Sequence, residues 1–232
     1  MQALFELENK FRDNLDKFIK QGDDAYKEID LKARAIAAVG QVASRDDGLQ
    51  PHQTETALVF AEVFSDMVLS IYFTACALDK PAQSVLRRSL ELGIAIVYIW
   101  DLPHVFWGWK THDYDLNFNE MIEHLSKDSY KSFLASLDIQ YTGGLFDYNE
   151  ARRLYRVLSN TVHGKIATHE SSIPDRFSHN TQDCRANLDL ILRVQGVLLR
   201  LYENRFPDYF LEMSKIIPAI NTIVYRQIYA TT

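Results

Sequence analysis

The chain has 232 residues, of which 47% are hydrophobic and 24% are charged, and its formal net charge is -6. This composition is typical of a soluble globular protein with a core of good size, and it excludes a disordered chain. An acidic chain of this kind is not a general nucleic-acid binder, so any contact with RNA or DNA needs a local basic patch.

The hydrophobic residues recur with helical spacing along nearly the whole chain, and no stretch alternates as a strand does. The pattern predicts an all-α fold, with helices over residues 2–21, 24–44, 53–78, 82–100, 150–164, 181–205 and 208–229, and one or two more within 119–137. The helix over 53–78 is almost without charge after Asp66, which indicates the central core helix. Pro218 is expected to kink the last helix.

Three segments are predicted to lie outside the helices. Residues 102–119 are aromatic and irregular and are expected to pack on the body, 138–147 contain a Gly-Gly turn, and 165–180 are polar. Most connections are short, and neither a repeat nor a low-complexity linker is present. The sequence therefore predicts one domain over residues 1–232. Its parts are a helical bundle over 53–205, peripheral N-terminal helices over 1–45 and a C-terminal helix over 207–229.

The two cysteines, Cys76 and Cys184, stand in unrelated contexts and form no CxxC pair. A zinc ribbon or a disulfide framework is therefore not expected, and both thiols are expected in the core. The first residues carry charges throughout, without the apolar stretch of a signal peptide. The longest strongly apolar run, over residues 67–78, is too short to span a bilayer. These features predict a cytoplasmic protein without a membrane partner.

The stretch EARRLYRVLSNTVHG, over residues 150–164, holds the most informative pair of residues, Arg156 and His163. Seven residues make almost two helical turns, so the two side chains are about 20° apart around the helix. Ser159 and Asn160 flank them on the same face. The apolar residues of this helix form a separate stripe roughly opposite: Ala151, Leu154, Tyr155, Leu158 and Val162. The helix is therefore expected to bury one side and to present a cation, an imidazole and two hydrogen-bonding groups on the other.

This set of groups suits phosphate chemistry. Arginine is always charged and offers a planar fork for phosphate oxygens, and histidine titrates near neutral pH. Together they could cleave RNA with no metal or other cofactor. His163 would act on the attacking 2′-hydroxyl or the leaving oxygen, while Arg156 would stabilise the charge on the phosphorane. The alternative is a solvated polar face with an ordinary histidine, because this spacing is also a common accident.

An all-α bundle with an Arg-x6-His motif near the end of a late helix resembles the HEPN superfamily. Arg156, Asn160 and His163 carry the resemblance in RVLSNTVHG. The segment SVLRRSLELGIAIVYIWD, over residues 84–101, is similar to a widespread bacterial HEPN-like family through its Arg-Ser-apolar-Glu pattern at Arg88 and Glu91. The resemblance covers roughly the helices from residue 53 to residue 205.

The resemblance implies a metal-independent endoribonuclease that acts as a homodimer, with two copies of the motif in one composite site. Arg156 would bind phosphate, His163 would transfer protons, and Asn160 or Ser159 would position the ribose. The residues expected to bind substrate or to orient His163 are Arg88, Glu91, Arg152 and Lys165. A toxin or phage-defence role is also implied, with an antitoxin or another defence-system protein as partner.

Two alternatives use the same face. One is a non-catalytic helical module that binds a protein partner, and the other is a small-nucleotide sensor. The apolar Val157 after Arg156 and the acidic net charge favour a non-catalytic binding module over a nuclease. Elsewhere, Arg87 and Glu91 are spaced to form an ion pair, and the aromatic residues of 102–119 either stack on bases or cap the core.

Overall fold

The computed structural model describes residues 2–22, 25–162 and 177–222. Within these ranges the fold is helical and contains no strand, which confirms the predicted all-α class. The helices are α1 (Gln2–Gln21), α2 (Ala25–Ala43), α3 (Pro51–Ala75), α4 (Asp79–Asp101), α5 (Pro103–Lys110), α6 (Phe118–Leu125), α7 (Asp128–Ser136), α8 (Tyr148–Val162), α10 (Thr181–Arg205) and α11 (Pro207–Ile216).

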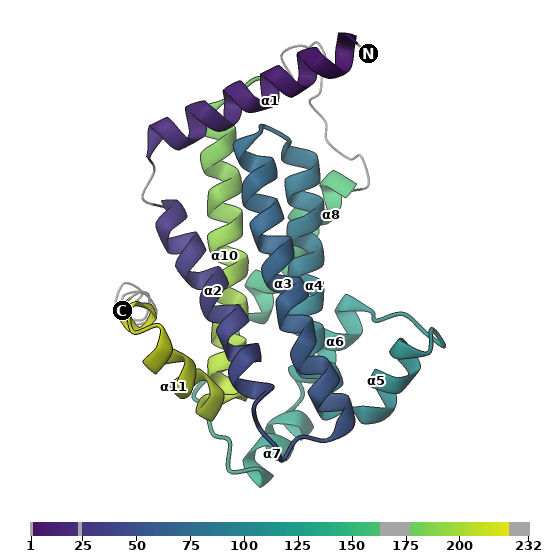
Figure 1. Cartoon of the computed structure of the whole chain (residues 1–232). Helices are drawn as coiled ribbons and strands as arrows, with labels where there is room; N and C mark the ends of the chain where they lie inside the picture. The colour runs from purple at the N-terminus through teal and green to yellow at the C-terminus, as the bar shows by residue number, and fades with distance from the viewer. Residues whose placement is uncertain (1, 23–24, 163–176, 223–232) are drawn as a thin grey trace.

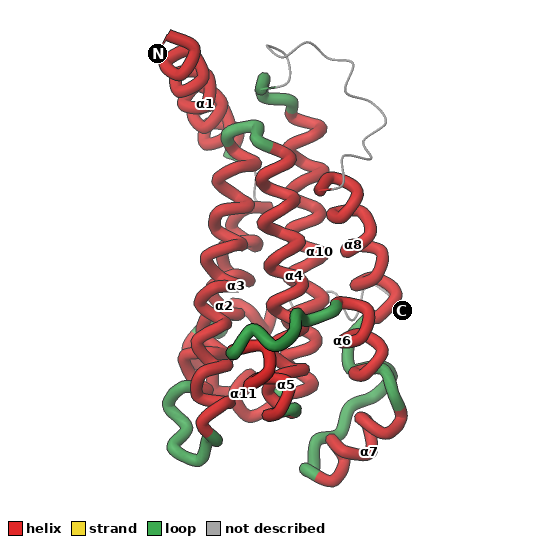
Figure 2. The backbone as a smooth tube through the Cα atoms, turned by 90° about the vertical axis from the view of Figure 1, so that its right-hand side faces the viewer, coloured by secondary structure: helices red, strands yellow, loops and turns green. Residues whose placement is uncertain are grey.

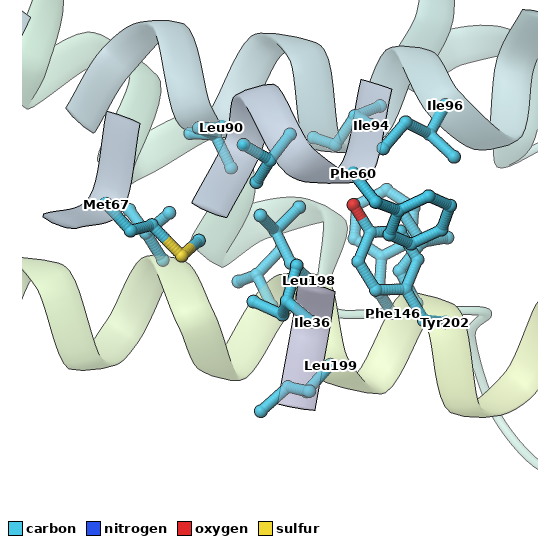
Figure 3. Close-up of a cluster of buried hydrophobic side chains, with 14 of the residues drawn as sticks. Ile36, Phe60, Met67, Leu90, Ile94, Ile96, Phe146, Leu198, Leu199 and Tyr202 are labelled. Carbon is cyan, nitrogen blue, oxygen red and sulfur yellow. The ribbon is translucent and has the colours of Figure 1, made fainter. Parts of the chain in front are cut away.

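Four long helices, α2, α3, α4 and α10, run side by side and enclose the core (Figure 1). Each contributes fully buried side chains, including Ile36, Phe60, Ile94 and Leu198 (Figure 3). The buried Tyr202 donates a hydrogen bond from its hydroxyl to the carbonyl of Gly93 at 3.0 Å. The smaller helices and α8 pack around this bundle.

Helix α2 is a bundle member, so its predicted place at the periphery is wrong. Its inward face is fully buried at Ile29, Ile36 and Val39. Short side chains let it approach α3 closely, and a Cβ atom built on Gly40 would lie 2.4 Å from the Cβ of Phe60. Alanine and glycine give a weak hydrophobic signal in the sequence, although they permit the tightest helix contacts. Helix α1 lies across the end of the bundle (Figure 1).

The aromatic segment over 102–119 contains a helix, α5, where the sequence predicted a loop. Pro103 occupies the first turn of α5, where its missing N–H costs no hydrogen bond. Val105 and Phe106 are buried against Ile99, whereas Trp107 stays exposed. Two turns of helix are too short to show a clear period among closely spaced aromatic residues. The next segment forms two short helices, α6 and α7.

Helix α11 ends at Ile216, before Pro218, where the sequence predicted one kinked helix over 208–229. Proline lacks the N–H that would continue the helix and disfavours helical geometry at the residue before it. The chain is helical again over residues 219–222, where Ile220 is buried, so the predicted helix is interrupted at Pro218 rather than ended there. The remainder of the predicted helix, from residue 223, lies outside the described residues.

Candidate functional site

Helix α8 carries the predicted motif and is anchored by its apolar stripe. Ala151, Leu154 and Leu158 are fully buried, and Tyr155 is half-buried. The helix begins after Asp147, whose carboxylate accepts a hydrogen bond from the backbone N–H of Glu150 at 2.9 Å. These contacts confirm the predicted inward stripe as far as Leu158 and fix which side of α8 faces solvent.

The solvent-facing side of α8 carries Arg152, Arg153, Arg156, Val157 and Asn160, all of them exposed. We call these five residues the α8 face. Arg153 is engaged, because its Nε donates to Glu150 at 2.8 Å. Within the described part of the chain, no hydrogen bond or ion pair involves the guanidinium of Arg152 or Arg156. Two cations on this face are therefore available to an anionic ligand.

Glu150 ties the first turn of α8 to α10. Its carboxylate accepts hydrogen bonds from Arg153 and from the Nε of Arg193, the latter at 2.7 Å. Burial favours the neutral acid, but the hydrogen bonds from Arg193 and Arg153 outweigh it and lower the pKa of Glu150. The carboxylate therefore stays ionised and holds the α8 face at a fixed place beside α10.

The two polar residues beside Arg156 have different surroundings. Asn160 is exposed one turn after Arg156, as predicted. Ser159 instead has a buried hydroxyl that, among the described residues, makes no hydrogen bond. Asn160 is therefore the better placed of the two to contact a ribose. The predicted site residues His163 and Lys165 lie outside the described residues.

Arg87, Glu91 and Tyr155 join α4 to the middle of α8. Arg87 pairs with Glu91 at 3.1 Å, which confirms the ion pair predicted from their spacing. The same guanidinium donates to the hydroxyl of Tyr155 at 2.8 Å. The ring of Tyr155 stacks on Phe118 of α6, with the centroids 3.9 Å apart and the planes 4° from parallel. Glu91 is therefore linked to α8 through Arg87, and it helps to position the helix that carries the α8 face.

Arg88 lies on the α3 side of α4. Its Nη1 donates to the two carboxylate oxygens of Asp66 at 2.6 and 2.7 Å, and its Nη2 lies 3.3 Å from Glu62. Burial raises the pKa of Asp66 although Arg88 opposes the shift. The predicted role of Arg88 at the motif is therefore corrected to an ion pair between α3 and α4. One position of difference turns a side chain about 100° around a helix, which separates Arg88 from Arg87.

A polar chain at the other end of α8 was not found from the sequence. The hydroxyl of Thr161 donates to Gln83, whose amide donates to Asn187 at 2.8 Å, and Asn187 donates to Asp79 at 2.6 Å. This series of hydrogen bonds fixes the last described turn of α8, directly before His163. The available signal was a buried amide, since Asn187 interrupts the apolar stripe of α10.

The remaining predicted features add no residue to the candidate site. Both cysteines are buried and neither forms a disulfide, which confirms their predicted place in the core. In the ranges that the structure describes, no group of three or more His, Cys, Asp or Glu side chains is placed to hold a metal ion. One described helix, α3, is long and apolar enough to cross a membrane, although core helices of soluble proteins share that property.

The chain matches no family model, no curated protein and no solved structure.

Proposed function

We propose that this protein is a metal-independent endoribonuclease of the HEPN type, which binds RNA phosphates on the α8 face. The observation that carries the proposal is the exposed, unengaged pair Arg152 and Arg156, within the described residues, on a helix otherwise tied down by ion pairs. A guanidinium without a carboxylate partner can offer both of its parallel N–H groups to a phosphate. Asn160, one turn on, can donate to or accept from a ribose hydroxyl.

His163 follows Val162 directly in the chain and is the proposed proton-transfer group. As a base it takes the proton of a ribose 2′-hydroxyl, and the 2′-oxygen then bonds to the adjacent phosphorus. The bond from phosphorus to the 5′-oxygen breaks, and a second imidazolium protonates that oxygen. The products are a 2′,3′-cyclic phosphate and a 5′-hydroxyl. Arg156 stabilises the additional negative charge on the pentavalent phosphorus.

The second imidazole comes from a second copy of the motif, so the proposal includes a homodimer with two α8 faces at one two-fold axis. Val157 supports such a contact, because it is an apolar side chain, 41% exposed, among the arginines. A cytoplasmic toxin or phage-defence effector, with an antitoxin or another defence protein as partner, is the biological role that the resemblance suggests.

Val157 also favours the second candidate function, a helical module that binds a protein partner without catalysis. Interfaces often combine arginine with apolar side chains that are desolvated together. In that case the same face binds a protein, and RNA is neither held nor cleaved.

RNA binding tests the α8 face without requiring catalysis. The probe is a fluorescent single-stranded RNA with 2′-O-methyl groups, which cannot be cleaved through the 2′-oxygen. Arg156→Gln should weaken binding about tenfold, and the slope of log affinity against log salt should fall by about one. The matched control is Arg45→Gln, an exposed arginine after α2. Equal affinities for the two variants would contradict RNA binding on the α8 face.

A further inference from the structure

The outer face of α3 is apolar, and no other described part of the chain covers it. An 18-residue window of this helix has a mean hydropathy of 1.6, yet only 39% of that window is buried. A helix apolar on all sides is normally covered on all sides. The large exposed side chains are Leu58 at 65%, Val68 at 44%, Leu69 at 43% and Tyr72 at 50%. Ala61 and Ser65 lie between them, and we call these six residues the α3 face.

The α3 face forms one stripe with large side chains at its ends and small ones at its centre. All its members lie within about 60° of Ser65 around the helix axis. Leu58 stands at one end, Val68, Leu69 and Tyr72 stand at the other, and Ala61 and Ser65 occupy the middle. This order of sizes is suited to pairing with an antiparallel copy of itself, because small central residues let two helices approach closely.

A groove with a volume of about 410 Å³ runs beside the Leu58 end of the stripe. Leu58, Ala61 and Phe64 form its α3 wall, Ala37 and Gly40 form its α2 wall, and Ile216 borders it from α11. Val68 lies one turn beyond Phe64 and two turns beyond Ala61, on the same side of α3. The groove and the side chains that could fill it therefore share one surface.

We propose that a second copy of this chain covers the α3 face, through a two-fold axis that passes Ser65 and pairs the two α3 helices antiparallel. This axis sets Leu58 opposite Tyr72 and Ala61 opposite Leu69 of the second copy. It also keeps the α2 side of one copy against the α2 side of the other. Val68 and Tyr72 of each copy then face the groove of the other copy.

The two-fold axis places the cluster of Arg88, Glu62 and Asp66 beside the same cluster of the second copy. Arg88 is held by Glu62 and Asp66, which flank Ser65 along the helix, so its guanidinium lies level with the axis. The carboxylate of Glu62 is 62% exposed and can accept a hydrogen bond from Arg88 of the second copy. A lipid bilayer would instead have to desolvate both charged groups at the edge of the stripe, which is costly.

The area suits a weak dimer. The α3 face runs from Leu58 to Tyr72, which is about 21 Å along the helix axis. The α3 face and the groove together are about two helix widths across, or roughly 20 Å. Their footprint of roughly 400 Å² per copy is about half of what each partner buries in an ordinary stable complex, which is typical of a contact that forms at high protein concentration.

The α3 contact is separate from the proposed nuclease site. Helices α3 and α8 lie on opposite sides of the bundle (Figure 2). Pairing through α3 therefore leaves both α8 faces open to RNA and to an α8 contact. Cysteine substitutions can report on the two contacts independently, because the native Cys76 and Cys184 are buried.

Cross-linking of the full chain tests the α3 axis. Ser65→Cys should give mostly covalent dimer with a short bis-maleimide, because the axis brings the two copies of residue 65 together. Ser132→Cys, exposed on α7, is the matched control and should stay largely uncross-linked. Asn160→Cys reports on the α8 contact, so failure of either contact shows separately. Equal, low cross-linking of Ser65→Cys and Ser132→Cys would overturn the α3 proposal.

A charged substitution provides the second test. Sedimentation should show wild type above the 26.8 kDa mass of one chain, and Val68→Asp should shift it toward smaller species. Leu137→Asp, at an exposed leucine after α7, should leave the mass of wild type unchanged. A wild-type monomer at high micromolar concentration would overturn the proposal. A wild-type monomer that floats with phosphatidylcholine vesicles would overturn it too and assign the α3 face to a membrane.

Discussion

The guanidinium of Arg87 lies 4.8 Å from the ring centroid of Tyr155 and donates a hydrogen bond to its hydroxyl. This clamp joins α4 to the middle of α8, and Phe118 stacks on the tyrosine ring. The buried stripe of α8 fixes its distance from the bundle, whereas the clamp fixes its rotation. The α8 face is therefore presented on a rigid element, which suits a site that must hold phosphate and ribose in register.

Tyr155→Phe should lower the free energy of unfolding by about 1–2 kcal/mol, because it removes the acceptor of a charged hydrogen bond. Tyr155→Leu should cost more, about 2–4 kcal/mol, since it also removes the stack on Phe118. Urea unfolding measures both. Tyr114→Phe, at an exposed tyrosine, is the control and should change stability by less than about 0.5 kcal/mol. An equally small effect of Tyr155→Phe would mean that the clamp does not hold α8.

Arg88→Met should destabilise the fold by about 2–4 kcal/mol at neutral pH, because Asp66 is left as a buried, unpaired carboxylate. Burial raises the pKa of Asp66 in the folded state even in wild type. Because the pKa of Asp66 is higher in the folded state than in the unfolded state, protonated Asp66 favours folding. This stability is fully present below the pKa of the unfolded state, near 3.8, and is lost as pH rises through the pKa of the folded state. The cost of Arg88→Met should therefore shrink as pH falls.

Urea unfolding between pH 4 and pH 8 measures this cost, and Asp66→Asn in the Arg88→Met background should restore part of the stability. If Arg88→Met instead left stability unchanged and abolished RNA binding, Arg88 would return to its predicted role as a substrate-binding residue.

Glu150→Gln should lower the free energy of unfolding by about 1–2 kcal/mol at pH 7, because two arginine hydrogen bonds lose their charged acceptor. The pKa of Glu150 is lowered in the folded state. Its contribution is therefore present above the unfolded value, near 4.5, and is lost as pH falls through the folded value. Wild type and variant should converge in acid. The control Glu123→Gln removes only an exposed pair with Lys127 and should be almost neutral; equal costs would contradict the anchoring role of Glu150.

Gly40→Ala should destabilise the α2–α3 contact by about 1–3 kcal/mol, because the added Cβ meets the Cβ of Phe60 and one helix must move. Gln41→Ala, at the exposed neighbouring position, is the control. Thermal unfolding of both variants measures the difference. A stabilising Gly40→Ala would show that α2 packs less closely than described.

Local periodicity was sufficient to predict the long helices, but not the short helix α5 and not which helices pack together. The ends of α1 and α10 match the predicted ranges, because long amphipathic helices show many turns of the same pattern. The inward side of α8 was also predictable, since Ala151, Leu154 and Leu158 repeat at helical spacing. The neighbours of a polar residue depend on tertiary packing, so the sequence could not show that Arg88 turns toward α3 or that Ser159 faces inward.

Cleavage of RNA is the most direct test of the proposed function. Purified wild type, His163→Ala, Arg156→Ala and Arg45→Gln are compared on total cellular RNA with chelator present. We predict cleavage by wild type and Arg45→Gln, leaving 2′,3′-cyclic phosphate and 5′-hydroxyl ends. His163→Ala and Arg156→Ala should be inactive and should keep the circular dichroism and thermal stability of wild type. Equal cleavage by wild type and His163→Ala, or none by wild type even with its native partners added, would contradict the nuclease proposal.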